Sequence, residues 1–208
     1  MKNLIRVSVI LLSATILLAQ DSNTFTSKSL GITLIKPANW VWETAQEHSE
    51  ALRNTKLSGN LQDVLARIVP KSPILMTKYR EPYEGFNPSF RADAFPMFGL
   101  DGSNPISMIA GNSTLVPKLV KDYREIQAPK ELNLGGFRAA YMKYFFTGET
   151  VDGKAYPVSA ELYVIPMGDY YWCFGISTSQ TPSPEEEEEI GSILRSIKIE
   201  IRADFKQP

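Results

Sequence analysis

The stretch that decides the fold is Phe137–Thr178, FRAAYMKYFFTGETVDGKAYPVSAELYVIPMGDYYWCFGIST. It contains three runs rich in aromatic and apolar residues, namely Phe137–Thr147, Tyr156–Ile165 and Tyr170–Thr178. The pairs Asp152-Gly153 and Gly168-Asp169 separate these runs, and glycine tolerates the positive φ that a tight hairpin turn needs. The stretch therefore predicts an antiparallel meander of three strands.

The first of these runs is apolar at neighbouring positions, because Tyr141, Met142 and Tyr144 are followed directly by Phe145 and Phe146. A strand with one wet face would instead alternate between apolar and polar residues. The pattern therefore predicts that the sheet is covered on both faces.

A helix is predicted directly after the meander. Ser183 is expected to cap it, Pro184 to occupy its first position, and Glu186 to complete a capping box with Ser183. The helix has an apolar stripe made of Ile190, Ile193, Leu194 and Ile197. Ile197–Ile201 is expected to continue as an edge strand.

Two strands and a helix are expected in the first part of the mature chain. Thr24–Lys28 and Ile32–Lys36 are the strand candidates, and Asn39 is expected to cap a short helix that contains Trp40 and Trp42.

The middle of the chain predicts a helix followed by a strand pair. Asn60–Val69 has apolar residues at helical spacing and is expected to end at Pro70. Ile74–Arg80 and Ser89–Phe95 flank the turn-rich loop EPYEGFNP and are expected to pair.

Asn104-Pro105 predicts a further helix start, because the missing N–H of proline costs nothing there. The apolar spacing continues to Tyr123 across Gly111 and Pro117, which predicts one helix with a break or two shorter helices. Two weaker strand segments are expected after it, Glu125–Ala128 and Glu131–Leu134.

Together these segments predict the α+β class, with a mostly antiparallel β-sheet sandwiched by helices on both faces. No repeat and no linker of flexible type interrupts the chain after its start. Residues 20–208 are therefore expected to form a single domain.

The residues resemble the PsbP-like α/β/α sandwich family, which includes the PsbP extrinsic protein of photosystem II, DcrB-type lipoproteins and related Ran-binding proteins. The segments that carry the resemblance are Gly31-Ile32 through Pro37, Trp40, Gly85-Phe86-Asn87-Pro88, Leu134-Gly135-Gly136 and Ile193-Leu194-Arg195-Ser196. The resemblance implies the sandwich fold and a function in binding rather than in catalysis. It transfers no metal-binding position to this chain.

Residues 1–19 are predicted to be a secretory signal peptide. Lys2 and Arg6 precede the apolar stretch Val7–Ala19, which is followed at once by polar residues. Spanning a membrane takes about 20 apolar residues, and this stretch is shorter, although a retained anchor is the alternative. We therefore expect an extracytoplasmic protein, periplasmic or secreted, with no stable membrane span after cleavage.

Composition excludes several classes of function. The chain has 22 Lys and Arg against 23 Asp and Glu, a net charge of −1, which argues against nucleic acid as a partner. His48 and Cys173 are the only residues of their types, so an internal disulfide is impossible and a zinc site is nearly excluded. The sequence contains no nucleophile elbow, P-loop or His-Glu-x-x-His motif. We expect no catalytic residue, no metal site and no cofactor.

Three features that could carry chemistry have simpler interpretations. His48 lies in a polar stretch and is interpreted as a solvated surface residue. Cys173 lies among aromatic residues and is interpreted as a small core residue. The run Glu185–Glu189 is interpreted as the solvated first turns of a helix, where carboxylates interact favourably with the helix dipole.

Aromatic and apolar residues in loops are the candidates for binding a partner. Tyr83 and Phe86 lie in one turn-rich segment, and Met97 and Phe98 lie in another. Such residues either pack into the core or form a binding patch, and both readings stay open. The strand between them carries Arg91 and Asp93, whose spacing of two predicts that they share one face.

The leading hypothesis is an exported, non-enzymatic binding or accessory protein that contacts an unknown protein or envelope component. Two alternatives stay open. One is a secreted hydrolase that uses carboxylates, with Glu149, Asp152 and Glu161 as candidates. The other is a carrier of a small ligand or a metal.

Overall fold

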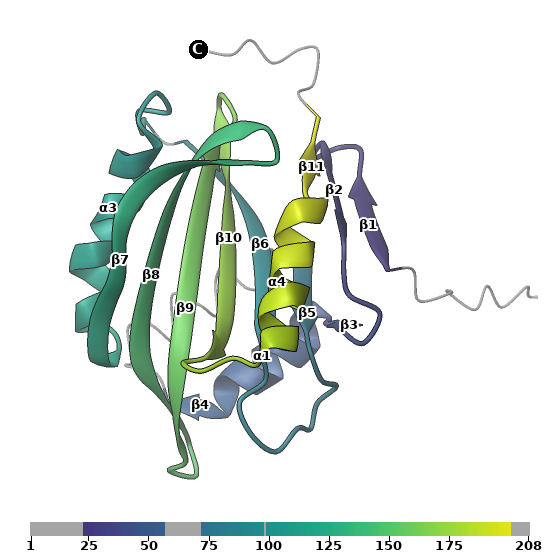
Figure 1. Ribbon diagram of the computed structural model, residues 1–208, viewed down its shortest axis with the longest axis vertical. Helices are drawn as coiled ribbons and strands as arrows, with labels where there is room; N and C mark the ends of the chain where they lie inside the picture. Colours follow the sequence, from purple (N-terminus) through teal and green to yellow (C-terminus); the bar gives the residue numbers. More distant parts are fainter. Residues whose placement is uncertain (1–22, 57–71, 98, 201–208) are drawn as a thin grey trace, which may run out of the picture.

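The computed structural model describes residues 23–56, 72–97 and 99–200. These residues form a large, strongly curved antiparallel sheet, a small three-stranded sheet and several helices (Figure 1). In chain order the elements are β1 Thr24–Ser27, β2 Ile32–Ile35, β3 Val41–Trp42, α1 Ala45–Arg53, β4 Thr55–Lys56, β5 Ile74–Thr77, β6 Ser89–Pro96, α3 Pro105–Leu115, the short helix η2 Val116–Lys118, β7 Lys121–Leu134, β8 Phe137–Thr150, β9 Ala155–Pro166, β10 Tyr170–Ser179, α4 Pro184–Ser196 and β11 Lys198–Ile199.

The predicted meander is confirmed as β8, β9 and β10. β8 pairs with β9 through partners such as Ala140 and Val164, and β9 pairs with β10. Gly153 has φ 87°, which is the left-handed backbone that the Asp152-Gly153 turn was expected to need. The main sheet runs in the order β3-β5-β6-β10-β9-β8-β4, with β7 paired to β8.

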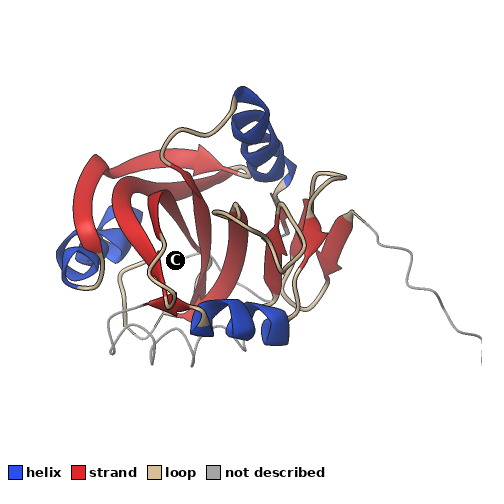
Figure 2. Ribbon diagram, turned by 90° about the horizontal axis from the view of Figure 1, so that it is seen from below, coloured by secondary structure: helices blue, strands red, loops and turns tan. Residues whose placement is uncertain are grey.

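The two faces of the main sheet carry two hydrophobic cores. On β10, Trp172, Phe174 and Ile176 point to one face and pack with α4 and with the small sheet β1-β2-β11. Tyr171 and Cys173 point to the other face, where α3 packs on β7, β8 and β9. Figure 2 shows helices on opposite sides of the curved sheet. The α+β sandwich with cover on both faces is thus confirmed.

Both predicted proline-containing helix starts are confirmed. At α4, Glu186 N donates to Ser183 Oγ at 3.2 Å, and Ser183 N donates to the Glu186 carboxylate at 3.4 Å. At α3, Ser107 N donates to the side chain of Asn104, and Pro105 occupies the first position. Each cap satisfies backbone donors that would otherwise lack a partner.

The helix predicted at Trp40 and Trp42 is wrong. Trp42 lies in β3, which pairs with β5, and Trp40 is fully buried in the preceding turn. The helix begins later because Thr44 and Glu47 form a reciprocal capping pair: Thr44 N donates to the Glu47 carboxylate, and Glu47 N donates to Thr44 Oγ1.

The expectation that helical structure continues to Tyr123 is also wrong. Helical structure ends at Lys118, and Tyr123 lies in β7. The two weak strand segments expected beyond it are parts of this single long strand, which pairs along β8 with several register shifts. The free edge of β8 offers backbone partners that a helix at this position would leave unused.

Several expectations fall on residues that the structure does not describe. The signal peptide Met1–Ala19, the helix Asn60–Val69 and the end of the strand Ile197–Ile201 lie wholly or partly outside the described residues, although β11 accounts for Lys198–Ile199. Among the described helices, none combines the length and apolar character that crossing a membrane requires.

The packing of α4 on the sheet gives a first prediction. Ile193 is completely buried, whereas Arg195 on the same helix is exposed. We expect Ile193→Ala to lower the free energy of unfolding by about 2–5 kcal/mol, because it opens a cavity between α4 and the sheet. The control Arg195→Ala should change it by less than about 1 kcal/mol. Urea unfolding followed by circular dichroism measures both, and equal losses would contradict this packing.

Candidate functional site

The residues predicted to bind a partner do not form one surface in the structure, because they lie in different elements. Tyr83 and Phe86 lie in residues 78–88, which join β5 to β6 and are called the tyrosine loop here. Arg91 and Asp93 lie within β6. Met97 follows β6 and is buried, with 8% of its surface exposed, while Phe98 lies outside the described residues.

The tyrosine loop presents two stacked aromatic rings at the surface. The ring centroids of Tyr79 and Tyr83 are 4.2 Å apart, with 13° between the planes. The two residues are 37% and 38% exposed, and Phe86 in the same loop is half-buried. Tyr79 is not among the predicted binding residues, because it falls in the expected strand Ile74–Arg80, whereas β5 ends at Thr77 in the structure. The signal that could have found it is the spacing of two tyrosines around Pro82.

Side-chain hydrogen bonds hold the tyrosine loop in shape. Asn87 Oδ1 accepts from Tyr79 N at 3.0 Å, and Asn87 Nδ2 donates to Tyr79 O and to the Glu81 carboxylate, both at 2.8 Å. The same carboxylate accepts from Tyr83 N at 2.8 Å. Each tyrosine is thus fixed at its backbone, so little conformational entropy remains to be lost on binding.

A buried ion pair joins the base of this loop to α4. Lys78 Nζ lies 2.8 Å from Glu189 Oε2, and the side chains are 8% and 11% exposed. Trp40 Nε1 donates to the same carboxylate at 3.1 Å, and Asn39 Nδ2 donates to its other oxygen. The prediction that Glu185–Glu189 is solvated is therefore wrong for Glu189, because its carboxylate accepts hydrogen bonds from three side chains.

The network shifts the pKa values of both ionic partners toward their charged forms. Burial raises the pKa of Glu189, but the hydrogen bonds from Lys78, Asn39 and Trp40 outweigh burial and hold it below the ordinary value. Burial lowers the pKa of Lys78, but the hydrogen bond and charge of Glu189 outweigh it and raise that pKa. Both groups are charged at neutral pH.

A small hollow lies next to the tyrosine loop. Its volume is about 10 Å³, room for about one water molecule. The lining residues are Val41, Trp42, Glu43, Glu47, Thr77, Arg80 and Glu81.

The interpretation of His48 as a solvated surface residue is wrong. Its Nδ1 lies 2.7 Å from Glu43 Oε2, and the side chains of His48 and Glu43 are 17% and 5% exposed.

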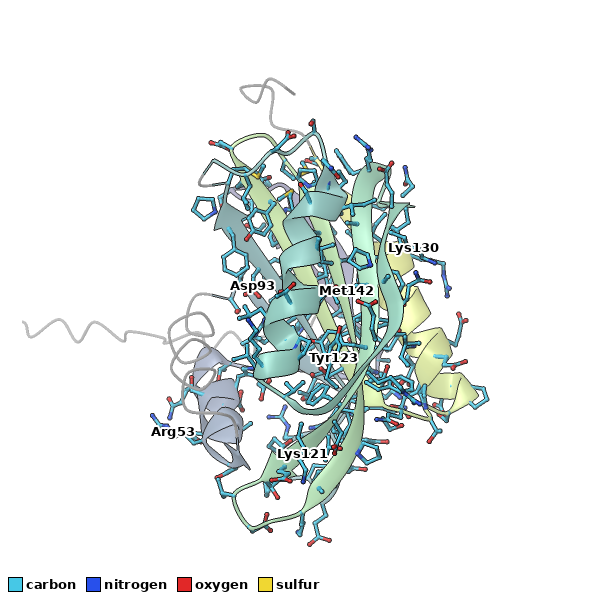
Figure 3. All side chains as sticks on the ribbon, turned by 90° about the vertical axis from the view of Figure 1, so that its left-hand side faces the viewer. Arg53, Asp93, Lys121, Tyr123, Lys130 and Met142 are labelled. Atoms are coloured by element: carbon cyan, nitrogen blue, oxygen red, sulfur yellow. The ribbon has the colours of Figure 1, made fainter. Side chains whose placement is uncertain are left out.

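Arg91 and Asp93 share one sheet face, as their spacing predicted. Arg91 Nε lies 2.7 Å from Asp93 Oδ2, and Ser72 Oγ donates to the other carboxylate oxygen. Asp93 is buried on the sheet face that α3 covers, because it is paired with Cys173, which packs in the core on that face (Figure 3). The two residues are bound to each other on a face that is largely covered.

Cys173 pairs in register with Asp93 and is half-buried. Burial raises the pKa of its thiol to about 11; Arg91 opposes this shift, and Asp93 adds to it. A high pKa keeps the thiol protonated and unreactive. The sequence context indicated aromatic neighbours for Cys173, and in the structure the charged residues Arg91 and Asp93 are its neighbours as well.

The carboxylates considered for hydrolysis are spread along the sheet, each with a partner. Glu149 pairs with Lys121 at 2.7 Å, and Glu161 pairs with Lys143 at 2.9 Å. Glu161 lies on β9 opposite Lys143 of β8, and Lys143 is six residues from Glu149 along β8. Glu149 and Glu161 are therefore about 20 Å apart. The two carboxylates of a glycosidase lie within about 10 Å of each other.

Asp152 in the β8–β9 turn has a pKa held below its ordinary value, mainly by a hydrogen bond from Thr150. A general acid needs a raised pKa instead. Among the described residues, no group of three His, Cys, Asp or Glu side chains is placed to hold a metal ion. In the described part of the chain, these carboxylates therefore form neither the close pair of a glycosidase nor a metal-binding cluster.

The fold and these features define an α+β sandwich with a preformed aromatic loop. No family model and no curated protein matches the chain. Among solved structures, a Bacteroides thetaiotaomicron protein aligns with a TM-score of 0.50 and 15% identity over 90% of this chain. This chain spans about half of that protein, 52% of its length.

Two further solved structures align over most of both chains. The Ran-binding protein Mog1p of Saccharomyces cerevisiae has a TM-score of 0.48 and 12% identity, covering 85% of this chain and 94% of its own. The cyanobacterial PsbP of Synechocystis has a TM-score of 0.48 and 10% identity, covering 91% and 99%. Two of the three kinds of protein named by the sequence resemblance, PsbP and a Ran-binding protein, are therefore among the matches, and the likeness is one of fold alone.

The buried ion pair at the base of the loop gives a second prediction. We expect Glu189→Gln to lower the free energy of unfolding at pH 7 by about 3 kcal/mol, because it leaves the Lys78 charge buried without a partner. Folding lowers the pKa of Glu189, so the charged carboxylate adds to the free energy of unfolding at pH values above the ordinary pKa of 4.5. This contribution is lost as the pH falls below 4.5 and the carboxylate is protonated. The difference between wild type and variant, measured by urea unfolding, should therefore shrink between pH 7 and pH 3. A constant difference would contradict the network.

The environment of the single cysteine gives a third prediction. At pH 8 a thiol with a pKa of about 11 has about 100-fold less thiolate than one at the ordinary value of 9.0. We expect Cys173 in the folded protein to react with Ellman's reagent at least about 100-fold more slowly than in guanidinium chloride. Equal rate constants would contradict the burial of the thiol.

Proposed function

We propose that this chain is an exported, non-enzymatic binding or accessory protein that contacts its partner through the tyrosine loop. In this proposal residues 1–19 direct export, and residues 20–208 form the single binding domain. The partner is a protein or an envelope component outside the cytoplasm. Nucleic acid is not the partner, since the chain has no surplus of basic residues.

The observation that carries the proposal is the stacked, exposed pair Tyr79 and Tyr83 on a loop that its own hydrogen bonds fix. Tyrosine is enriched among the residues that dominate interface energies, because it buries a large area with few rotatable bonds. An exposed stack gives no stability comparable to a core contact. Its fixed geometry is suited to binding a second surface.

Among the other candidate residues, Phe86 adds to the same surface because it lies half-buried in the tyrosine loop. Arg91 and Asp93 are held in their ion pair, and Met97 is packed in the core. These three residues are engaged within the fold, so we place the contact on Tyr79, Tyr83 and Phe86.

Affinity capture tests this proposal. We expect the double variant Tyr79→Ser/Tyr83→Ser, immobilised and exposed to native envelope extract, to retain its partner at least about 10-fold less than wild type. The matched control is Val151→Ser, since Val151 is the most exposed large apolar residue described, at 64%, and lies in the β8–β9 turn. Quantitative mass spectrometry of the bound proteins measures retention.

Thermal unfolding of the three proteins checks that the double variant is folded. Equal retention by wild type, the double variant and Val151→Ser would overturn the assignment of the binding surface. Loss of the same proteins in the control variant would overturn it as well.

A further inference from the structure

The surface around the tyrosine loop carries more carboxylates than cations. Glu81 and Glu84 lie in the loop, and the first turn of α4 adds Glu185, Glu186 and Glu187. Glu186 is close enough to act electrostatically on both Lys78 and Tyr79. The rings are thus set among negative charges.

The cations at this surface already have carboxylate neighbours. Lys78 is paired with Glu189, so its charge is compensated. Arg80 lies beside the hollow and acts on Glu47, whose pKa is held below its ordinary value mainly by hydrogen bonds from Thr44. The remaining electrostatic potential of the surface is therefore negative.

The hollow continues this chemistry next to the tyrosine loop, because Arg80 and Glu81 belong to both. Its lining includes three carboxylates, one guanidinium and the Trp42 ring. The hollow is too small to admit a side chain, but its carboxylates and aromatic ring add to a surface that suits a guanidinium or ammonium group. Such a group donates hydrogen bonds to carboxylates and can lie on an aromatic face.

The stacked rings already hold one cation of the protein itself. Lys78 Nζ lies 5.9 Å from the centroid of the Tyr79 ring, within the range of a cation–π contact. Tyr83 stacks on Tyr79 and is 38% exposed, and among the described residues no cation–π contact involves its ring. A cation from a partner would repeat at Tyr83 the contact that Lys78 makes with Tyr79.

We infer that the tyrosine loop, the adjacent hollow and the first turn of α4 together bind a Lys- or Arg-rich segment of a partner protein. This inference rests on the proposed function and names the chemical class of the partner. A second copy of this chain is a poor occupant, because a two-fold contact would bring the same carboxylates against each other. An anionic lipid surface would meet the same repulsion.

Labelled peptides test the inference directly. The probes are a dodecapeptide of alternating Arg and Gly and a neutral dodecapeptide of alternating Ser and Gly, titrated with the purified protein and followed by fluorescence anisotropy. We expect saturable binding of the Arg peptide only, weakened as salt is raised from about 0.05 to 0.5 M.

Two double variants with the same net charge locate the binding surface. Glu84→Gln/Glu186→Gln removes two of the five negative charges of the proposed surface, and glutamine at 186 keeps the capping box. Glu125→Gln/Glu131→Gln removes two charges from β7 instead. We expect the first pair to weaken Arg-peptide binding about fivefold and the second to change it less than about twofold. Tyr79→Ser/Tyr83→Ser should weaken it at least about tenfold.

Equal weakening by the two glutamine pairs, equal binding of the neutral peptide, or no saturable binding of the Arg peptide would overturn the inference. So would self-association through the loop in sedimentation velocity. Envelope capture that depends on the tyrosines but is unchanged at 0.5 M salt would overturn the cationic partner while the proposed function stands. Capture that does not depend on the tyrosines would overturn the proposed function itself.

Discussion

The structure depends on a central set of strands that is apolar on both faces. In β10, Trp172, Phe174 and Ile176 are almost completely buried on one side, while Tyr171 and Cys173 contact the other core. Such a sheet is stable in water only when both faces are covered, because burial of apolar area is the main favourable term in folding. The helices α3 and α4 supply that cover, and the short β1-β2-β11 sheet extends it.

The helix α4 connects this core to the surface that we assign to binding. Its buried face packs on the sheet through Ile190 and Ile193, and the same helix carries Glu189, which binds Lys78 at the base of the tyrosine loop. The position of Tyr79 and Tyr83 is therefore set by core packing through one buried ion pair. A surface fixed in this way needs no rearrangement before it meets a partner.

Local signals predicted the elements whose neighbours in space are also neighbours in sequence. The β8–β9–β10 meander follows from its turns and apolar runs, and α4 follows from the capping box at Ser183. The two errors have different causes. Trp42 joins β3 because β5, which lies far along the chain, offers it a backbone partner. Tyr123 joins β7 because β7 forms a hairpin with the next strand, β8, although the apolar spacing at Tyr123 is that of a helix.

The sequence by itself determined the two-sided sheet, its hairpin turns, the caps of two helices and the even balance of charge, because each depends on residue type and short spacing. Only the tertiary structure decided that Tyr79 stacks on Tyr83, that Glu189 and Lys78 form a buried pair, and that the hollow lies beside them. The ion pair joins the loop after β5 to α4, and the hollow joins residues around β3 and α1 to the loop after β5, so both depend on how the fold places elements that are distant in sequence. The tyrosine stack lies within one loop, but its orientation and exposure depend on the fold that holds that loop.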